Sequence, residues 1–175
     1  KDKIIQDNII ESNKMVKDKV FKKELIINRE KKIQTLLNTI FEAADGVRIV
    51  GDGKHIIHET DCLKITHEFS EGVYIRRMDF DKDTFVAGAI HKDLHVWFLM
   101  IGNITVATNE EGSREFIAPC YVIANPGVQR LIYAKENSIF MNIYPNPSNK
   151  EDIDEIEKRI YCLNREEYNE YIKNK

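Results

Sequence analysis

The sequence lacks long hydrophobic segments and has few cysteines, and both absences exclude classes of protein. No apolar run in the 175-residue chain approaches the roughly 20 residues that a membrane-spanning helix needs. The first residues, KDKIIQDNII, contain no apolar signal-peptide core. The three cysteines, Cys62, Cys120 and Cys162, stand at wide intervals without a pairing pattern. We therefore expect a cytoplasmic protein with reduced thiols and no membrane partner.

The sequence motifs of several common protein classes are also absent. The chain contains no glycine-rich phosphate loop, no Gly-x-Ser-x-Gly sequence and no C-x2-C pair. Its net charge is −3, and no basic stripe with interleaved aromatic residues is present. Nucleic acid is therefore not expected as a partner. Charged residues make up 31% of the chain and hydrophobic residues 42%, which is typical of a globular protein.

Glycine and proline are missing from residues 1–44, where Lys, Glu, Ile and Leu are frequent. Apolar residues between Ile33 and Phe41 follow helical spacing, so we predict a helical extension over residues 1–45. A C-terminal helix is predicted over residues 148–175. Its apolar stripe consists of Ile153, Ile156, Ile160 and Leu163.

Between these segments, residues 46–147 have the pattern of a β protein. Short runs rich in β-branched and aromatic residues alternate with turns such as Glu71-Gly72 and Asn125-Pro126-Gly127. Many short strands with regular turns predict a mainly β sandwich or barrel. The predicted strands are 62–68, 73–80, 84–91, 94–101, 103–108, 114–117, 120–124, 128–134 and 138–144.

Two histidines, His91 and His95, stand four residues apart in an apolar run whose composition favours strand over helix. An even separation places both on one face of a strand, together with Trp97. Two imidazoles and an indole that face the same way from a buried strand indicate a pocket. The opposite face is expected to pack outward against helices or a second sheet, and it consists of Leu94, Val96, Phe98 and Met100.

Arginines form a second group of candidates. Arg76 and Arg77 face opposite ways on the strand predicted at 73–80, so one of them should point inward. Arg130 follows the Pro-Gly turn. A buried guanidinium is costly unless it is paired, and its forked donors suit carboxylate or phosphate. The alternative is an ion pair with a nearby acidic residue, for which the candidates are Glu68, Glu71 and Asp79.

The block from Gly88 to Tyr144 resembles the cupin superfamily, whose first motif is G-x5-H-x-H-x3-4-E-x6-G. Gly102 matches the closing glycine of that motif. His95 stands at the position of the glutamate and His91 at that of the second histidine. The resemblance implies a cupin-like double-stranded β-helix, a jelly-roll barrel, over residues 46–147.

The second cupin motif, G-x5-P-x-G-x2-H-x3-N, is matched in part. Gly127 corresponds to its glycine, whereas Arg130 stands at the histidine and Ala134 at the asparagine. Half of the usual metal-binding set is therefore present. The pattern is closer to small cupin-like proteins of tailed bacteriophages, and the matching residues are His67, His91, His95, Pro126, Gly127 and Arg130.

The two histidines are candidate ligands of a divalent metal such as Zn, Fe, Mn or Ni. A metal needs a third ligand, and His67, Tyr144 or Asp93 could provide it. The alternative is a hydrogen-bonded polar cluster inside the barrel, without metal.

The resemblance brings the candidate residues together at one barrel mouth. Tyr144 replaces the closing histidine of the phage pattern there, and Trp97 could stack on a ligand or belong to the core. Gln129 and Asn142 could orient a ligand by hydrogen bonds. The full set of expected ligand-binding residues is His67, Arg76, His91, His95, Trp97, Gln129, Arg130, Asn142 and Tyr144.

These observations predict a small-molecule-binding protein of phage or prophage type, acting in the cytoplasm of a bacterial or infected host cell. It would sequester or modify an anionic, nucleotide-derived metabolite of host defence. One alternative is a metal-dependent cupin enzyme, such as an oxygenase, isomerase or lyase. Another is a virion or assembly scaffold. A homodimer is expected, because cupin barrels commonly pair through their sheets and the extension carries more apolar surface than one barrel can cover.

Overall fold

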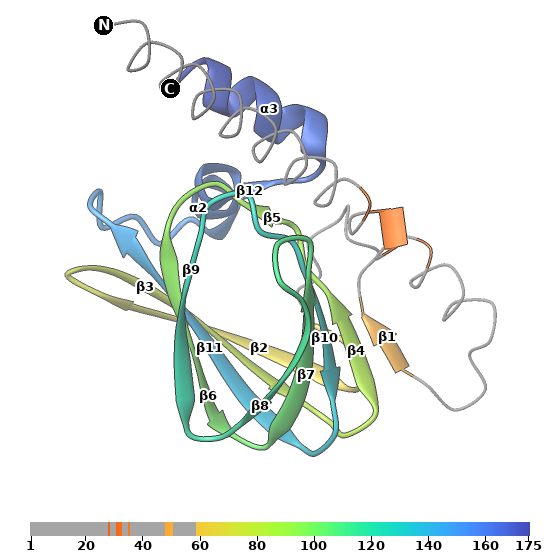
Figure 1. Cartoon of the computed structure of the whole chain (residues 1–175). Helices are drawn as coiled ribbons and strands as arrows, with labels where there is room; N and C mark the ends of the chain where they lie inside the picture. Colours follow the sequence, from red (N-terminus) through yellow and green to blue (C-terminus); the bar gives the residue numbers. More distant parts are fainter. Residues whose placement is uncertain (1–27, 29–30, 33–34, 36–47, 51–58) are drawn as a thin grey trace, which may run out of the picture.

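Alternation of apolar and polar residues produces the strands of a jelly-roll barrel (Figure 1). The computed structural model describes residues 28, 31–32, 35, 48–50 and 59–175. The strands are β1 (Arg48–Val50), β2 (Leu63–Ser70), β3 (Gly72–Phe80), β4 (Thr84–Ala87), β5 (Ile90–His91), β6 (His95–Ile101), β7 (Asn103–Thr108), β8 (Gly112–Ile117), β9 (Cys120–Ala124), β10 (Arg130–Ala134), β11 (Ser138–Asn146) and β12 (Tyr161–Cys162).

Within this described part, the strands form two five-stranded sheets that face each other. One sheet has the order β1-β4-β10-β7-β8 and the other the order β2-β3-β11-β6-β9. A short third sheet pairs β12 with β5. The mainly β jelly-roll barrel predicted from the sequence is thereby confirmed. Most of the predicted helical extension lies outside the described residues, and positions 28, 31, 32 and 35 within it are helical.

The barrel core is built from the inward-facing residues of both sheets. Along β3 and β11 every second side chain is buried, as a strand with one face in the core requires. The large side chains at the centre, Leu99, Ile104 and Phe140, are fully buried. They belong to the main hydrophobic cluster of the barrel.

Two predicted elements are divided in the structure. The strand predicted at 84–91 ends at Ala87, and its last two residues form β5 in a different sheet. The single helix predicted over 148–175 is wrong, because two helices, α2 (Ile153–Ile160) and α3 (Arg165–Lys173), are separated by β12. Pairing of β12 with β5 overrides the helical pattern there.

Polar caps fix where these two helices begin. The side chain of Asp152 accepts a hydrogen bond from the backbone N–H of Glu155 (3.1 Å) at the start of α2. Asn164 caps α3 in the same way, through the N–H of Glu167 (2.9 Å). Figure 1 shows α2, β5 and β12 together at one end of the barrel. Among the described helices, none combines the length and apolarity required to span a membrane.

The turn between β6 and β7 explains the glycine of the first motif. Gly102 has φ +95°, a conformation that side-chain-bearing residues rarely adopt. A Cβ atom there would lie 2.2 Å from the Oγ of Ser138. Only glycine fits this close approach of two chain segments.

The outer face of the sheet β2-β3-β11-β6-β9, here called the second sheet, is more exposed than predicted. Phe98 and Val96 are half-buried, and Leu94 and Met100 are exposed. No described helix or sheet covers this face, so the expected outward packing is not found within the described residues. Neighbouring β9 adds Tyr121 and Ile123, which are 64% and 59% exposed.

Candidate functional site

The two histidines come from opposite sides of a strand break and meet inside the barrel. His91 ends β5 and His95 begins β6, and their side chains are buried. Their imidazole rings stack with centroids 4.1 Å apart and planes 11° from parallel. Between them the chain bulges outward, and Asp93 is exposed at this irregularity.

Arg130, the first residue of β10, holds both imidazoles through one nitrogen. Its Nη2 donates to Nε2 of His91 (2.7 Å) and to Nε2 of His95 (2.9 Å). Asn142 also accepts a bond from this nitrogen through its Oδ1 (3.3 Å). A guanidinium can only donate, so both Nε2 atoms must be unprotonated acceptors.

The partners of the other ring nitrogens then follow. Nδ1 of His95 carries the proton and donates to the backbone carbonyl of Asp93 (3.2 Å). Nδ1 of His91 likewise donates to the hydroxyl of Tyr144 (3.2 Å). Burial and the neighbouring charge of Arg130 lower the pKa of His95 to about 3 and the pKa of His91 well below 6.5. Both imidazoles are therefore neutral at neutral pH.

The hydrogen-bond chain continues to the edge of a cavity. The hydroxyl of Tyr144 accepts from Nδ1 of His91 and shares a second hydrogen bond with the hydroxyl of Tyr161, 3.0 Å away, in which either oxygen can be the donor. Burial raises the pKa of Tyr144 well above 10, which keeps this hydroxyl protonated. Tyr161 in turn lines the cavity.

The second inward arginine has a carboxylate partner. Arg76 is buried on β3, and its Nη1 forms an ion pair with Glu157 of α2, which is also buried. Arg77 faces outward and pairs with Asp79 (2.7 Å). The sequence pattern thus separated the two arginines correctly, but the partner of Arg76 is none of the three acidic residues considered.

Arg130 has no such partner. Within the described part of the chain, no carboxylate lies within ion-pair distance of its guanidinium. Its Nη1 is buried without a hydrogen-bond partner there. Burial lowers the pKa of Arg130, as expected for a cation withdrawn from water.

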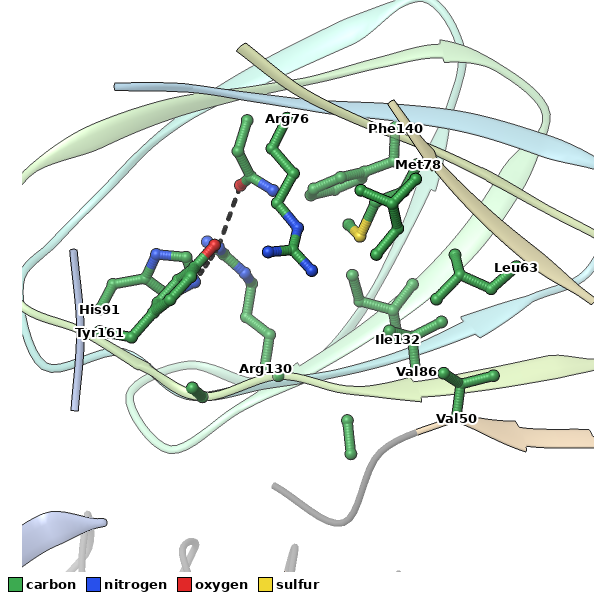
Figure 2. Close-up of a pocket in the computed structure, with 15 residues that line it drawn as sticks. Val50, Leu63, Arg76, Met78, Val86, His91, Arg130, Ile132, Phe140 and Tyr161 are labelled. Atoms are coloured by element: carbon green, nitrogen blue, oxygen red, sulfur yellow. Dashed lines mark hydrogen bonds between the residues drawn. The ribbon is translucent and has the colours of Figure 1, made fainter. Parts of the chain in front are cut away.

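These groups border a cavity of about 70 Å³ (Figure 2). Figure 2 shows Arg76, His91, Arg130 and Tyr161 at one side of it and aliphatic and aromatic side chains at the other. The polar lining consists of Arg76, His91, Arg130, Asn142 and Tyr161. The apolar lining includes Val50, Leu63, Ile65, Met78, Val86, Ile132 and Phe140.

Three predicted residues lie away from this cavity. Trp97 belongs to the core, where it stacks on Phe140 with centroids 4.9 Å apart. Gln129 donates through Nε2 to the carbonyl of Gly88 (3.2 Å). His67 bonds the hydroxyl of Tyr74 (2.8 Å).

Sequence reasoning missed Glu157 and Tyr161, which both come from the C-terminal segment. Glu157 lies three residues before Ile160 and four after Ile153, so it falls on the apolar stripe of its helix. A carboxylate on a buried stripe is a signal that could have been recognised. No local pattern indicates that Tyr161 pairs with the strand that ends at His91.

The arrangement does not fit a divalent metal. The lone pairs that would bind it, on Nε2 of His91 and His95, already accept hydrogen bonds from Arg130. Both lone pairs point to one atom, Nη2 of Arg130, at 2.7 and 2.9 Å, so a cationic guanidinium occupies the position that a metal ion would need. The described residues also contain no group of three or more His, Cys, Asp or Glu able to hold a metal ion.

The chain is similar in structure to several cupin barrels. A cupin superfamily protein from Desulfitobacterium hafniense matches with a TM-score of 0.44 and 11% identity, over 51% of this chain and 83% of that one. A Cupin 2 conserved barrel domain protein from Salinispora arenicola matches with a TM-score of 0.43 and 14% identity, over 60% and 98%.

A third similar structure is a salicylate 1,2-dioxygenase variant from Pseudoaminobacter salicylatoxidans, solved in complex with gentisate. It matches with a TM-score of 0.45 and 10% identity, over 67% of this chain and 32% of that one. No protein-family model and no curated protein sequence matches the chain.

Proposed function

We propose that this protein binds a small anionic molecule inside its barrel, at Arg130. The observation that carries the proposal is a buried cation whose partners are all neutral, namely two imidazoles and an amide oxygen. Buried charges in proteins are paired, because an isolated one costs several kcal/mol of desolvation. The unpartnered Nη1 is the atom to which an anionic oxygen would bind.

The charges around the cavity support the same conclusion. Glu157 neutralises Arg76, and both histidines are uncharged at neutral pH. The lining groups therefore carry one net positive charge, on Arg130. A bound anion would complete the pairing that the protein itself leaves open.

The two alternative functions receive less support. A metal-dependent enzyme would need His91 and His95 to turn away from Arg130 and find a third ligand. A scaffold has no need for a cavity with two inward arginines. We keep the phage or prophage role as a hypothesis about where the protein acts, and the binding proposal does not depend on it.

We propose further that two copies associate through the outer face of the second sheet. Single exposed apolar residues are normal, but a contiguous group on β11, β6 and β9 marks an interaction surface. In the sheet register, Phe98 lies between Met141 and Tyr121, and Val96 lies between Ile143 and Ile123. The neighbouring charges, Arg77 and Asp79, neutralise each other. Such a face is self-complementary, as a two-fold dimer requires.

The binding proposal is tested by thermal unfolding of the full chain with a panel of small anions. At least one anion should raise the melting temperature of the wild type and leave that of Arg130→Gln unchanged. Arg77→Gln is the matched control, because Arg77 is on the outer face and should leave ligand stabilisation intact. Equal stabilisation of the wild type and Arg130→Gln would contradict the proposal.

A further inference from the structure

We infer that the ligand of the barrel is a short-chain monocarboxylate with about four to six non-hydrogen atoms. The inference rests on the proposed function and adds the ligand's size, charge and shape. It follows from three features of the cavity: its volume, its hydrogen-bond donors and its apolar wall.

The volume sets the size. The cavity measures about 70 Å³. One water-sized group needs ~10–15 Å³ of such volume, so the cavity holds about five or six of them. An apolar cavity that binds benzene measures about 150 Å³. A nucleotide or an aromatic acid therefore exceeds the available space, whereas acetate, propionate and butyrate fit it.

The donor groups of the lining set the chemistry. Among the described residues that line the cavity, the group without a partner is a donor, the Nη1 of Arg130. The hydroxyl of Tyr161 can also donate to a ligand when Tyr144 is the donor in the bond between the two tyrosines. Both residues line the cavity, and hydrogen bonds through His91 and Tyr144 connect Arg130 to the hydroxyl of Tyr161. The two oxygens of a carboxylate accept one bond from each donor. An ammonium ion carries only donors, so it could not accept hydrogen bonds from Arg130 and Tyr161.

The charge of the lining selects a monoanion. Arg76 is already paired with Glu157, which leaves one uncompensated positive charge. A monocarboxylate balances that charge. Phosphate or a dicarboxylate would bring a second negative charge into a space without a cation to receive it.

The opposite wall accepts an alkyl chain. Beyond the arginines the cavity is bordered by apolar residues such as Met78, Ile132 and Phe140. Each added methylene that enters this space should raise the affinity about fourfold, until the space is filled. A longer chain must then displace packed side chains, so its affinity should fall.

The test is a calorimetric titration of the full chain with sodium acetate, propionate, butyrate and hexanoate. Affinity should rise from acetate to butyrate and fall for hexanoate. Butanol, butylamine, inorganic phosphate and adenosine monophosphate should bind at least tenfold more weakly than butyrate. Arg130→Gln should lose at least tenfold in butyrate affinity, and Tyr161→Phe should lose several-fold. Arg77→Gln should bind as the wild type does.

The outcomes separate this inference from the proposal beneath it. Arg130-dependent binding of phosphate or the nucleotide, without binding of the short carboxylates, would overturn the inference and leave anion binding intact. Butanol binding as tightly as butyrate would overturn both. If Arg130→Gln fails to fold, the chain-length series on the wild type and the Tyr161→Phe comparison still decide the inference.

Discussion

The two ends of the barrel interior are built by the same strands and are held together differently. On β11 the inward residues run from Phe140 through Asn142 to Tyr144, opposite Met78, Arg76 and Tyr74 of β3. The first pair belongs to the large aliphatic and aromatic core. The last pair belongs to a cluster rich in tyrosine that α2 and β12 cover.

The same alternation of inward and outward side chains thus builds an apolar end and a polar end, and the two are stabilised differently. Close packing stabilises the apolar end, and small changes of volume are felt there. At the polar end a chain of hydrogen bonds runs from Arg130 through His91 and Tyr144 to Tyr161, and each member of this chain has another member as its partner. Within this chain, the Nη1 of Arg130 is the atom without a partner. Arg130 both lines the cavity and bonds the two histidines.

The largest effect is expected from a cavity in the apolar end. Leu99 is fully buried and does not line the cavity. Leu99→Ala should reduce the free energy of unfolding by about 2–5 kcal/mol, measured by urea denaturation. Met100→Ala, on the outer face of the same strand, is the control and should cost less than about 1 kcal/mol. Similar losses for both would show that the two faces of β6 are misassigned.

At the polar end, His91→Ala should destabilise by leaving partners unsatisfied. It removes the acceptor of Arg130 and the donor to Tyr144, both of which are buried. The expected loss is about 1–3 kcal/mol in the free energy of unfolding. His91→Gln, which retains an acceptor and a donor, should recover part of it. A loss below about 0.5 kcal/mol would mean that these hydrogen bonds are not formed in solution.

Acidification should weaken the polar end before the apolar end. In the unfolded chain a histidine takes up a proton near pH 6.5, whereas the folded-state pKa of His95 is about 3. The unfolded state therefore binds more protons, and stability must fall as pH decreases below 6.5. Between pH 6.5 and 5.5 His95 should account for about 1 kcal/mol of this loss. His95→Gln should have a correspondingly smaller pH dependence, measured by denaturation at each pH.

The smallest effect on folding is expected on the outer face, where the readout is association. Tyr121→Glu and Ile123→Glu change exposed positions and should alter the free energy of unfolding of a monomer by less than about 0.5 kcal/mol. They should nevertheless convert a dimer into a monomer in sedimentation velocity. Lys64→Glu, on β2 of the same sheet, is the control. A wild-type monomer at high micromolar concentration would refute the dimer.

Period-two patterning predicted much of this arrangement. It separated Arg76 from Arg77, because side-chain direction in a strand depends only on local geometry. His91 and His95 do meet in the interior, but they belong to strands of two different sheets, so even spacing along one strand is not the reason. Period-two patterning could not show how far along the barrel axis an inward residue lies. Trp97, two residues after His95, lies in the core cluster, and spacing alone does not distinguish these environments.

What escaped prediction depends on contacts between distant segments. Glu157 meets Arg76 across 81 residues, and the pairing of Tyr161 with His91 follows from a strand of two residues. That no carboxylate among the described residues pairs with Arg130 is a property of the assembled interior. No short stretch of the sequence could have indicated it.

The short pairing of β12 with β5 has a consequence for the order in which the protein becomes functional. Glu157 and Tyr161 follow every strand of the two large sheets in chain order, so they leave the ribosome after those strands. A nascent chain that ends before residue 150 can pair those strands but has no wall to close the ligand cavity. Binding competence should therefore be acquired after the barrel strands have been made, and a ligand-dependent stabilisation would report that Glu157 and Tyr161 have joined them.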